Sequence, residues 1–196
     1  MPKSCHLAAA LGLMLALPGA ARANIVVNGG FGAVLSGWSN NWSSESAIVH
    51  SGSRSAASGC QDPTCVNPNS PARSFLSQDL PTVAGGVYTL DFFVNQVGGA
   101  PHALRVYWGG ALVFASADTP DGLGFVEHGV GNLSAAGATT ASTFLGRDGP
   151  DTVYLDDVSV VQAAVPVPKS VPVPVPATLA LAGTAAFGLL SLRRRV

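Results

Sequence analysis

Lysine is almost absent from this sequence, and it is missing altogether between Asn24 and Gln162. That stretch holds all eleven acidic residues of the chain but only four basic ones, which gives it a net charge of −7 with histidine neutral. Nucleic-acid binding depends on Lys and Arg placed against phosphate, so this acidic composition excludes nucleic-acid binding by the stretch. The four basic residues are Arg54, Arg73, Arg105 and Arg147.

The sequence also lacks the short motifs of common enzyme classes. It contains no G-x-S-x-G turn, no H-E-x-x-H helix, no P-loop and no dinucleotide-binding fingerprint. His50, His102 and His128 stand in no catalytic pattern, and although two carboxylates can hydrolyse glycosides, any acidic β-sandwich contains such pairs. We expect no enzyme activity.

The amino-terminal end has the organisation of a secretory signal peptide. Lys3 supplies the positive region, Leu7 to Leu17 the apolar region, and Ala21-Arg22-Ala23 an A-x-A cleavage site. Residues 1–23 are therefore predicted to be removed. An uncleaved anchor is the alternative, although the apolar region is short for a membrane span.

The carboxy-terminal end carries a second export feature. A Pro/Val-rich linker at 163–176 precedes an uncharged apolar run at 177–192, which together with the last linker residues approaches the roughly 20 residues that cross a bilayer. The basic tail 193–196 begins with Arg193, Arg194 and Arg195, which favour the cytoplasmic side. We predict a single transmembrane helix with the N-terminus outside. The alternative is a buried core helix.

This succession of prolines, apolar run and terminal arginines resembles the PEP-CTERM sorting signal of Gram-negative bacteria. The resemblance implies processing by exosortase, a membrane cysteine peptidase, and transfer from the inner membrane to the cell surface or an extracellular matrix. The signature of that signal is Pro-Glu-Pro, and Pro174-Val175-Pro176 occupies the corresponding place here. Val175 thus stands where the family has an acidic residue. This difference affects the prediction of cleavage more than the prediction of membrane insertion.

Two of the three cysteines, Cys60 and Cys65, enclose a short loop that contains Pro63. In an exported chain this spacing indicates a disulfide. A disulfide that closes so small a loop should stabilise the fold by less than the roughly 3 kcal/mol assigned to a 15-residue loop. A catalytic thiol and a zinc site are the alternatives, and zinc would need two further soft ligands that no nearby histidine spacing provides.

The stretch 24–162 is predicted to be one all-β domain, because short alternating segments follow one another between Gly and Pro turns. In Val87 to Gln96, Tyr88, Leu90, Phe92 and Val94 share one face. The other expected strands are 24–28, 47–50, 55–57, 73–80, 103–108, 111–117, 125–133, 138–145 and 152–161.

The order of four segments resembles the jelly-roll domains of the galactose-binding-like and carbohydrate-binding-module kind. The segments are Val27 to Phe31 with Gly37-Trp38, Phe75 to Leu80, Val87 to Phe92, and Tyr154 to Val160. The resemblance implies a jelly-roll β-sandwich, and it also suggests a structural calcium at Asp156 and Asp157. Hydrogen bonding of this acidic pair to loop amides is the favoured alternative.

Aromatic side chains on the surface would serve sugar recognition, with polar groups beside them. The candidates are Trp38, Trp42, Tyr107 and Trp108, with Arg105, Arg147 and Asp148 as companions. We expect Trp108 in the core and Trp38 at the end of the sandwich. Trp42 and Tyr107 are expected to face outward, with Arg105 beside them.

The main hypothesis is a non-enzymatic surface or matrix protein that exosortase sorts, without cofactors apart from the calcium suggested above. One alternative is a carbohydrate-binding module for exopolysaccharide. Another is a periplasmic protein that stays anchored in the membrane.

Overall fold

The computed structural model describes residues 22–118, 124–149 and 151–164. The predicted signal peptide up to residue 21, the linker beyond residue 164, the sorting motif, the predicted transmembrane helix at 177–192 and the arginine tail lie outside these residues. Within the part of the chain that is described, no helix is long and apolar enough to cross a membrane. Export, anchoring and sorting therefore stay predictions.

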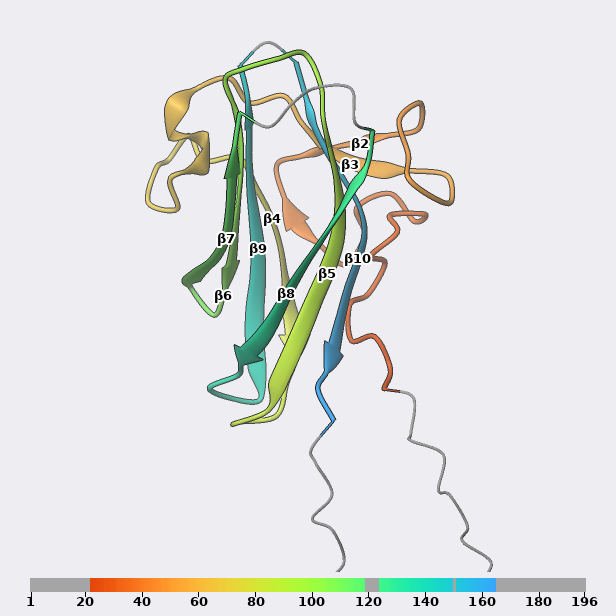
Figure 1. Ribbon diagram of the computed structural model, residues 1–196, viewed down its shortest axis with the longest axis vertical. Coiled ribbons are helices and arrows are strands. Elements are labelled where there is room, and N and C mark those ends of the chain that lie inside the picture. Colours follow the sequence, from red (N-terminus) through yellow and green to blue (C-terminus); the bar gives the residue numbers. More distant parts are fainter. Residues whose placement is uncertain (1–21, 119–123, 150, 165–196) are drawn as a thin grey trace, which may run out of the picture. The chain divides into compact units, whose positions relative to one another are not determined.

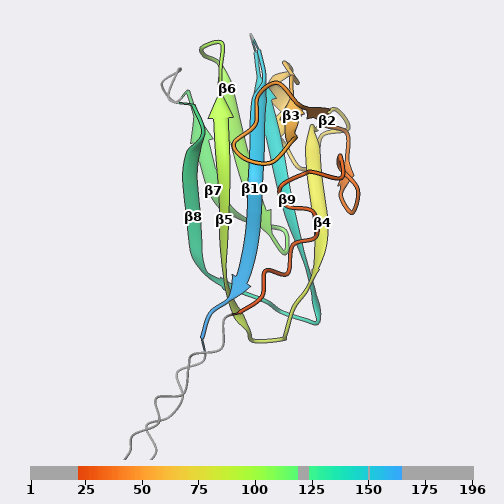
Figure 2. The same cartoon turned by 90° about the vertical axis from the view of Figure 1, so that its right-hand side faces the viewer.

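The described residues form two antiparallel sheets that pack face to face (Figure 1). Sheet A has the order β1-β4-β9-β6-β7, and sheet B, which faces the viewer in Figure 2, has the order β2-β3-β10-β5-β8. The chain passes repeatedly between the sheets, as in Greek-key sandwiches. The strands are β1 Ser39–Asn40, β2 Ser43–Glu45, β3 Ser55–Ser58, β4 Phe75–Pro81, β5 Val87–Gln96, β6 His102–Trp108, β7 Ala111–Ala117, β8 Val126–Ser134, β9 Thr139–Asp148 and β10 Val153–Gln162.

Strand β5 shows how the sequence positions the core. Its bounds and its buried face agree with the prediction: Tyr88, Leu90, Phe92 and Val94 are all buried between the sheets. Side chains alternate between the two faces of a strand, so every second residue of β5 points away from the core. The predicted all-β sandwich is confirmed.

Two segments predicted as strands are not strands. Residues 47–50 lie in the loop between β2 and β3. Residues 24–28 run beside β10, but the side-chain amide of Gln78 replaces a strand partner: Val27 N donates to Gln78 Oε1 at 2.8 Å, and Gln78 Nε2 donates to Val27 O at 2.9 Å. A side chain thus satisfies the backbone groups that a neighbouring strand would otherwise take.

Aromatic rings connect the two sheets through the core. Phe144 of β9 and Phe92 of β5 are fully buried, and their ring centroids lie 5.4 Å apart. Trp38 is buried in the same core and packs against Phe144, with 6.3 Å between the ring centroids. Trp108 is buried as predicted, and its Nε1 donates to Ser134 O at 2.8 Å.

Gly29 allows the turn at 28–31 to approach β10. Its carbonyl accepts a hydrogen bond of 3.0 Å from Val158 N, and a Cβ at position 29 would overlap the Val158 carbonyl. We expect Gly29→Ala to lower the free energy of unfolding by about 1–3 kcal/mol, the usual cost of overpacking. Urea denaturation measures it, and Gly32→Ala is the matched control because a Cβ there meets nothing within 4 Å. Equal stability of the two variants would contradict the close approach.

His128 makes the stability of the sandwich depend on pH. Its ring packs against Phe114 and Phe92, with centroids 4.9 and 5.6 Å away. Burial favours the neutral ring and lowers the pKa of His128 below its ordinary value of 6.5. Because the unfolded chain then binds more protons, stability should be lost as pH falls through about 6.5. In urea melts between pH 8 and 5, His128→Phe should lose less stability than the wild type, and parallel losses would refute this role.

Candidate functional site

The outer face of sheet A presents two rows of side chains that run across the strands. In the first row, Ser39, Ser77, Thr143, Tyr107 and Leu112 pair successively through β1, β4, β9, β6 and β7. Residues directly opposite each other in antiparallel strands have Cβ atoms about 4.5–5.5 Å apart, so this row is continuous. It places two small hydroxyl side chains between an edge strand and a tyrosine ring.

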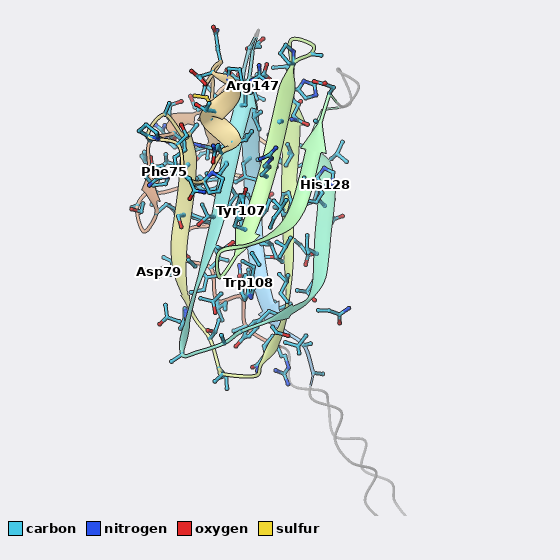
Figure 3. The ribbon with its side chains drawn as sticks, turned by 90° about the vertical axis from the view of Figure 1, so that its left-hand side faces the viewer. Phe75, Asp79, Tyr107, Trp108, His128 and Arg147 are labelled. Carbon is cyan, nitrogen blue, oxygen red and sulfur yellow. A yellow bond between two sulfur atoms is a disulfide. The ribbon has the colours of Figure 1, made fainter. Side chains whose placement is uncertain are left out.

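The second row lies two residues further along the strands. Phe75 of β4 pairs with Leu145 of β9, which pairs with Arg105 of β6. The two rows together form what we call the groove face. Figure 3 looks onto it, with Phe75 and Asp79 on β4, Tyr107 on β6 and Arg147 on β9.

The groove face contains an open groove of about 700 Å³. Its floor is small and polar at Ser77 and Thr143, whose hydroxyl oxygens lie 2.7 Å apart, while the rings of Phe75 and Tyr107 stand on either side of β9. Hydroxyls beside aromatic rings suit a ligand with apolar faces and many hydroxyl groups. The lining residues are Gly37, Ser39, Pro68, Arg73, Phe75, Ser77, Gln78, Asp79, Tyr107, Gly110, Thr143 and Leu145.

Charged groups stand at opposite ends of the groove. The Arg73 guanidinium lies over the Phe75 ring, 5.1 Å from its centroid, and Arg105 is half-buried one strand beyond Leu145. Asp79 is exposed toward the other end of β4. The groove is therefore positive at the Arg73 end and negative at the Asp79 end.

The predicted disulfide between Cys60 and Cys65 is confirmed, with the two Cα atoms 6.2 Å apart. It closes residues 60–65, which include all of the short helix η1, Pro63–Val66, except its last residue. Backbone hydrogen bonds tie this loop to the end of sheet A, since Asp148 N donates to Cys60 O at 2.9 Å and Ser74 N donates to Cys65 O at 2.9 Å. The loop therefore holds the residues that lead into β4 at a fixed place beside the groove.

Two arginines, Arg105 of the groove face and Arg147 further along β9, bind this loop and the residue that follows it. Arg105 Nη1 donates to Val66 O at 3.2 Å, and Arg147 Nε donates to Gln61 O at 3.3 Å. These contacts fix where the guanidinium groups lie. Further along the chain from this loop, Pro68 and Arg73 line the positive end of the groove.

Of the three predicted sugar contacts, the structure brings two to the groove face and buries the third. Tyr107 lines the groove and Arg105 lies in the adjacent row, whereas Trp42 is only 6% exposed, so the expectation that it faces outward is wrong. The Trp42 ring lies between the sheets against Gly146, where an added Cβ would come within 2.7 Å of it. It cannot reach a ligand on the groove face.

Most residues of the groove were not predicted from the sequence. Phe75, Ser77 and Asp79 are outward-facing residues of β4, and the alternation of this strand with its buried residues 76, 78 and 80 was the available signal. Thr143 carries the same signal on β9. Only the pairing of β4, β9 and β6 shows that these residues share one surface.

The acidic pair Asp156 and Asp157 binds the loop before β3. Asp156 is buried and its Oδ2 accepts hydrogen bonds from His50 N at 2.8 Å and Ser51 N at 3.2 Å. Burial raises the pKa of Asp156 above its ordinary value, which the bonds from backbone amides partly offset. Asp157 contacts His50 Nδ1 at 2.7 Å and Ser51 Oγ at 2.9 Å.

These contacts engage all four carboxylate oxygens, because Asp156 Oδ1 accepts from Asp157 N. Among the described residues, no three His, Cys, Asp or Glu side chains come together as a metal site. The arrangement agrees with hydrogen bonding of the acidic pair to loop amides, and the suggested calcium site stays a prediction.

No protein-family model matches the sequence, and no curated protein matches it. Solved structures do. A family 61 carbohydrate-binding module in complex with β-1,4-galactotriose superimposes with a TM-score of 0.53 at 19% identity, over 72% of this chain and 99% of the module. A family 16 carbohydrate-binding module gives 0.52 at 13% identity, over 70% and 99%.

The K3 adhesin domain of Lys-gingipain from Porphyromonas gingivalis is similar as well, with a TM-score of 0.51 at 16% identity over 71% of this chain and 99% of that domain. These likenesses show the fold. The body has the jelly-roll sandwich of carbohydrate-binding modules, which confirms the galactose-binding-like architecture expected from the sequence.

Proposed function

We propose that this protein binds polysaccharide through the groove face and performs no catalysis on it. The observation that carries the proposal is the groove itself, where Tyr107 and Phe75 flank the hydroxyl groups of Ser77 and Thr143 on an open sheet. The jelly-roll fold shared with carbohydrate-binding modules supports it. Both findings favour the carbohydrate-binding alternative over the broader hypothesis of a matrix protein.

Recognition follows from the chemistry of the lining. A sugar ring has apolar faces that pack on aromatic rings, while its hydroxyl groups lie at the edges and exchange hydrogen bonds with polar side chains. Tyr107 and Phe75 supply the rings, and Asp79 supplies a charged acceptor, which makes stronger hydrogen bonds than a neutral one. An open groove also accepts the interior of a polymer.

Binding of the full chain, purified in detergent, to an array of bacterial and plant polysaccharides tests this function. We expect saturable binding to at least one polymer and competition by its soluble oligosaccharides. If no polysaccharide on the array bound above the level of an unrelated detergent-solubilised protein, the proposed function would be wrong.

Export and sorting form a second part of the proposal, motivated by the sequence features at the two ends. The protein is secreted by its signal peptide, held in the inner membrane by residues 177–192, and handed to an exosortase-like enzyme that releases it to the surface or matrix. Mass spectrometry of the protein from its own cells tests this. Recovery of an intact peptide that runs into the apolar stretch would rule out processing and favour a permanent anchor.

A further inference from the structure

We propose that the polysaccharide bound in the groove is acidic and places a carboxylate at the arginine end. This inference rests on the proposed function and names the class of its ligand. A neutral polymer would need only the aromatic rings and hydroxyl groups. The charges on the groove face require a further explanation.

The distribution of basic residues is uneven. The described residues contain no lysine and five arginines, in a body that is strongly acidic. Arg73 lines the groove, Arg105 lies in the second row of the groove face, and Arg147 lies two residues beyond Leu145 on β9. Asp79 is the one carboxylate among the residues that line the described groove. The arginine end of the groove face therefore offers positive charge to an anion on a protein that is otherwise strongly acidic.

The arginines remain able to bind a ligand. Among the described residues, none of the three forms an ion pair with a carboxylate within 4.0 Å. Arg105 and Arg147 each give one N–H to a loop carbonyl, and the Arg73 guanidinium lies over the Phe75 ring with a long contact of 3.5 Å from Nη1 to Ser70 O. A guanidinium carries five N–H donors in a planar fork that matches a carboxylate.

Arg73 places a positive charge beside an aromatic ring on which a sugar can pack. Its guanidinium and the Phe75 ring lie one above the other at the groove wall. A sugar that packs on this wall would bring a carboxylate on its ring edge close to the guanidinium. A uronic acid residue has this combination of an apolar ring face and a carboxylate on the ring.

A purely structural role is the competing explanation, because Arg147 also holds the disulfide-closed loop and Arg105 holds Val66 directly after it. That role predicts a loss of stability when an arginine is replaced. It predicts no dependence of affinity on the charge of the ligand. Changing the ligand rather than the protein therefore separates the two.

The test compares polygalacturonate and polymannuronate with their fully methyl-esterified forms, which keep the sugar backbone and lose the charge. Affinity of the full chain is measured by calorimetry at low and at 0.5 M salt. We expect an acidic form to bind about 10- to 100-fold more tightly than its ester, as hydrogen bonds to charged groups imply, and this preference to shrink at high salt.

Three variants complete the experiment. Arg73→Gln should remove most of the preference for the acidic form, and Arg73→Lys should restore part of it. Arg54→Gln is the matched control, because Arg54 donates to Ser44 Oγ beside sheet B and lies outside the groove lining. It should leave the preference unchanged.

The outcomes separate the two proposals. Equal affinity for the acid and the ester, or tighter binding of the ester, overturns the inference and leaves polysaccharide binding intact. A preference that survives Arg73→Gln but falls with Arg54→Gln also overturns it. Absence of binding to every acidic and neutral polysaccharide overturns the proposed function and the inference with it.

Discussion

Replacing Tyr107 with alanine should lower the affinity for the bound polysaccharide by about 30-fold or more, because a tyrosine at the centre of a binding surface contributes about 2 kcal/mol or more. Tyr107 stands on the outer side of β6 and lines the groove next to Thr143. The folded core should be almost unaffected, since the side chain points away from it. Affinity is measured by calorimetry with the polymer that binds best, and stability by urea denaturation.

Phe125→Ala is the matched control for Tyr107→Ala. Phe125 is also a partly exposed aromatic residue, but it precedes β8 of sheet B and packs near His50, at 5.6 Å between ring centroids. Its removal should change the affinity less than twofold. Equal losses in the two variants, or no loss with Tyr107→Ala, would show that the groove face does not hold the sugar.

Phe144→Ala should produce the largest loss of stability, about 3–5 kcal/mol in the free energy of unfolding. Phe144 is fully buried, and its ring meets Phe92 of the opposite sheet and Trp38, which directly precedes β1. Alanine would leave a cavity between the sheets, because partners from two separate segments cannot both move inward. Urea denaturation followed by tryptophan fluorescence measures the loss.

Val83→Ala serves as the control for this core substitution. Val83 is 59% exposed, so its truncation should change stability by no more than about 0.5 kcal/mol. If Phe144→Ala were no more destabilising than Val83→Ala, the aromatic contacts would not be what joins the two sheets.

The fold was predictable where side chains alternate or a turn is explicit. β5 begins and ends at the predicted residues because its alternating run stops at Gly turns, and β7 does so because it follows the Gly109-Gly110 hairpin turn. The predictions of strands at 24–28 and 47–50 were wrong, because short β-branched runs resemble strands even where no strand forms. The amide of Gln78, far away in the sequence, takes the hydrogen bonds that a strand neighbour would have taken at Val27.

The site was predictable only in part, for a different physical reason. Tyr107 could be assigned to the surface because it lies between the inward-facing Val106 and Trp108. Trp42 lies just before β2, where no periodicity tells which way a side chain points, and it proved to be buried. The groove itself depends on the register of β4 against β9 and of β9 against β6, which no local pattern encodes.

The most direct test of sugar binding on sheet A is to record the amide chemical shifts of the full chain during titration with the oligosaccharide that competes best. We predict that the largest changes fall on β4, β9 and β6, around Ser77, Thr143 and Tyr107, and on the loop around Arg73. The amides of β5, β8 and β10 should change little. Changes centred on sheet B or on its loop around His50 would contradict the account.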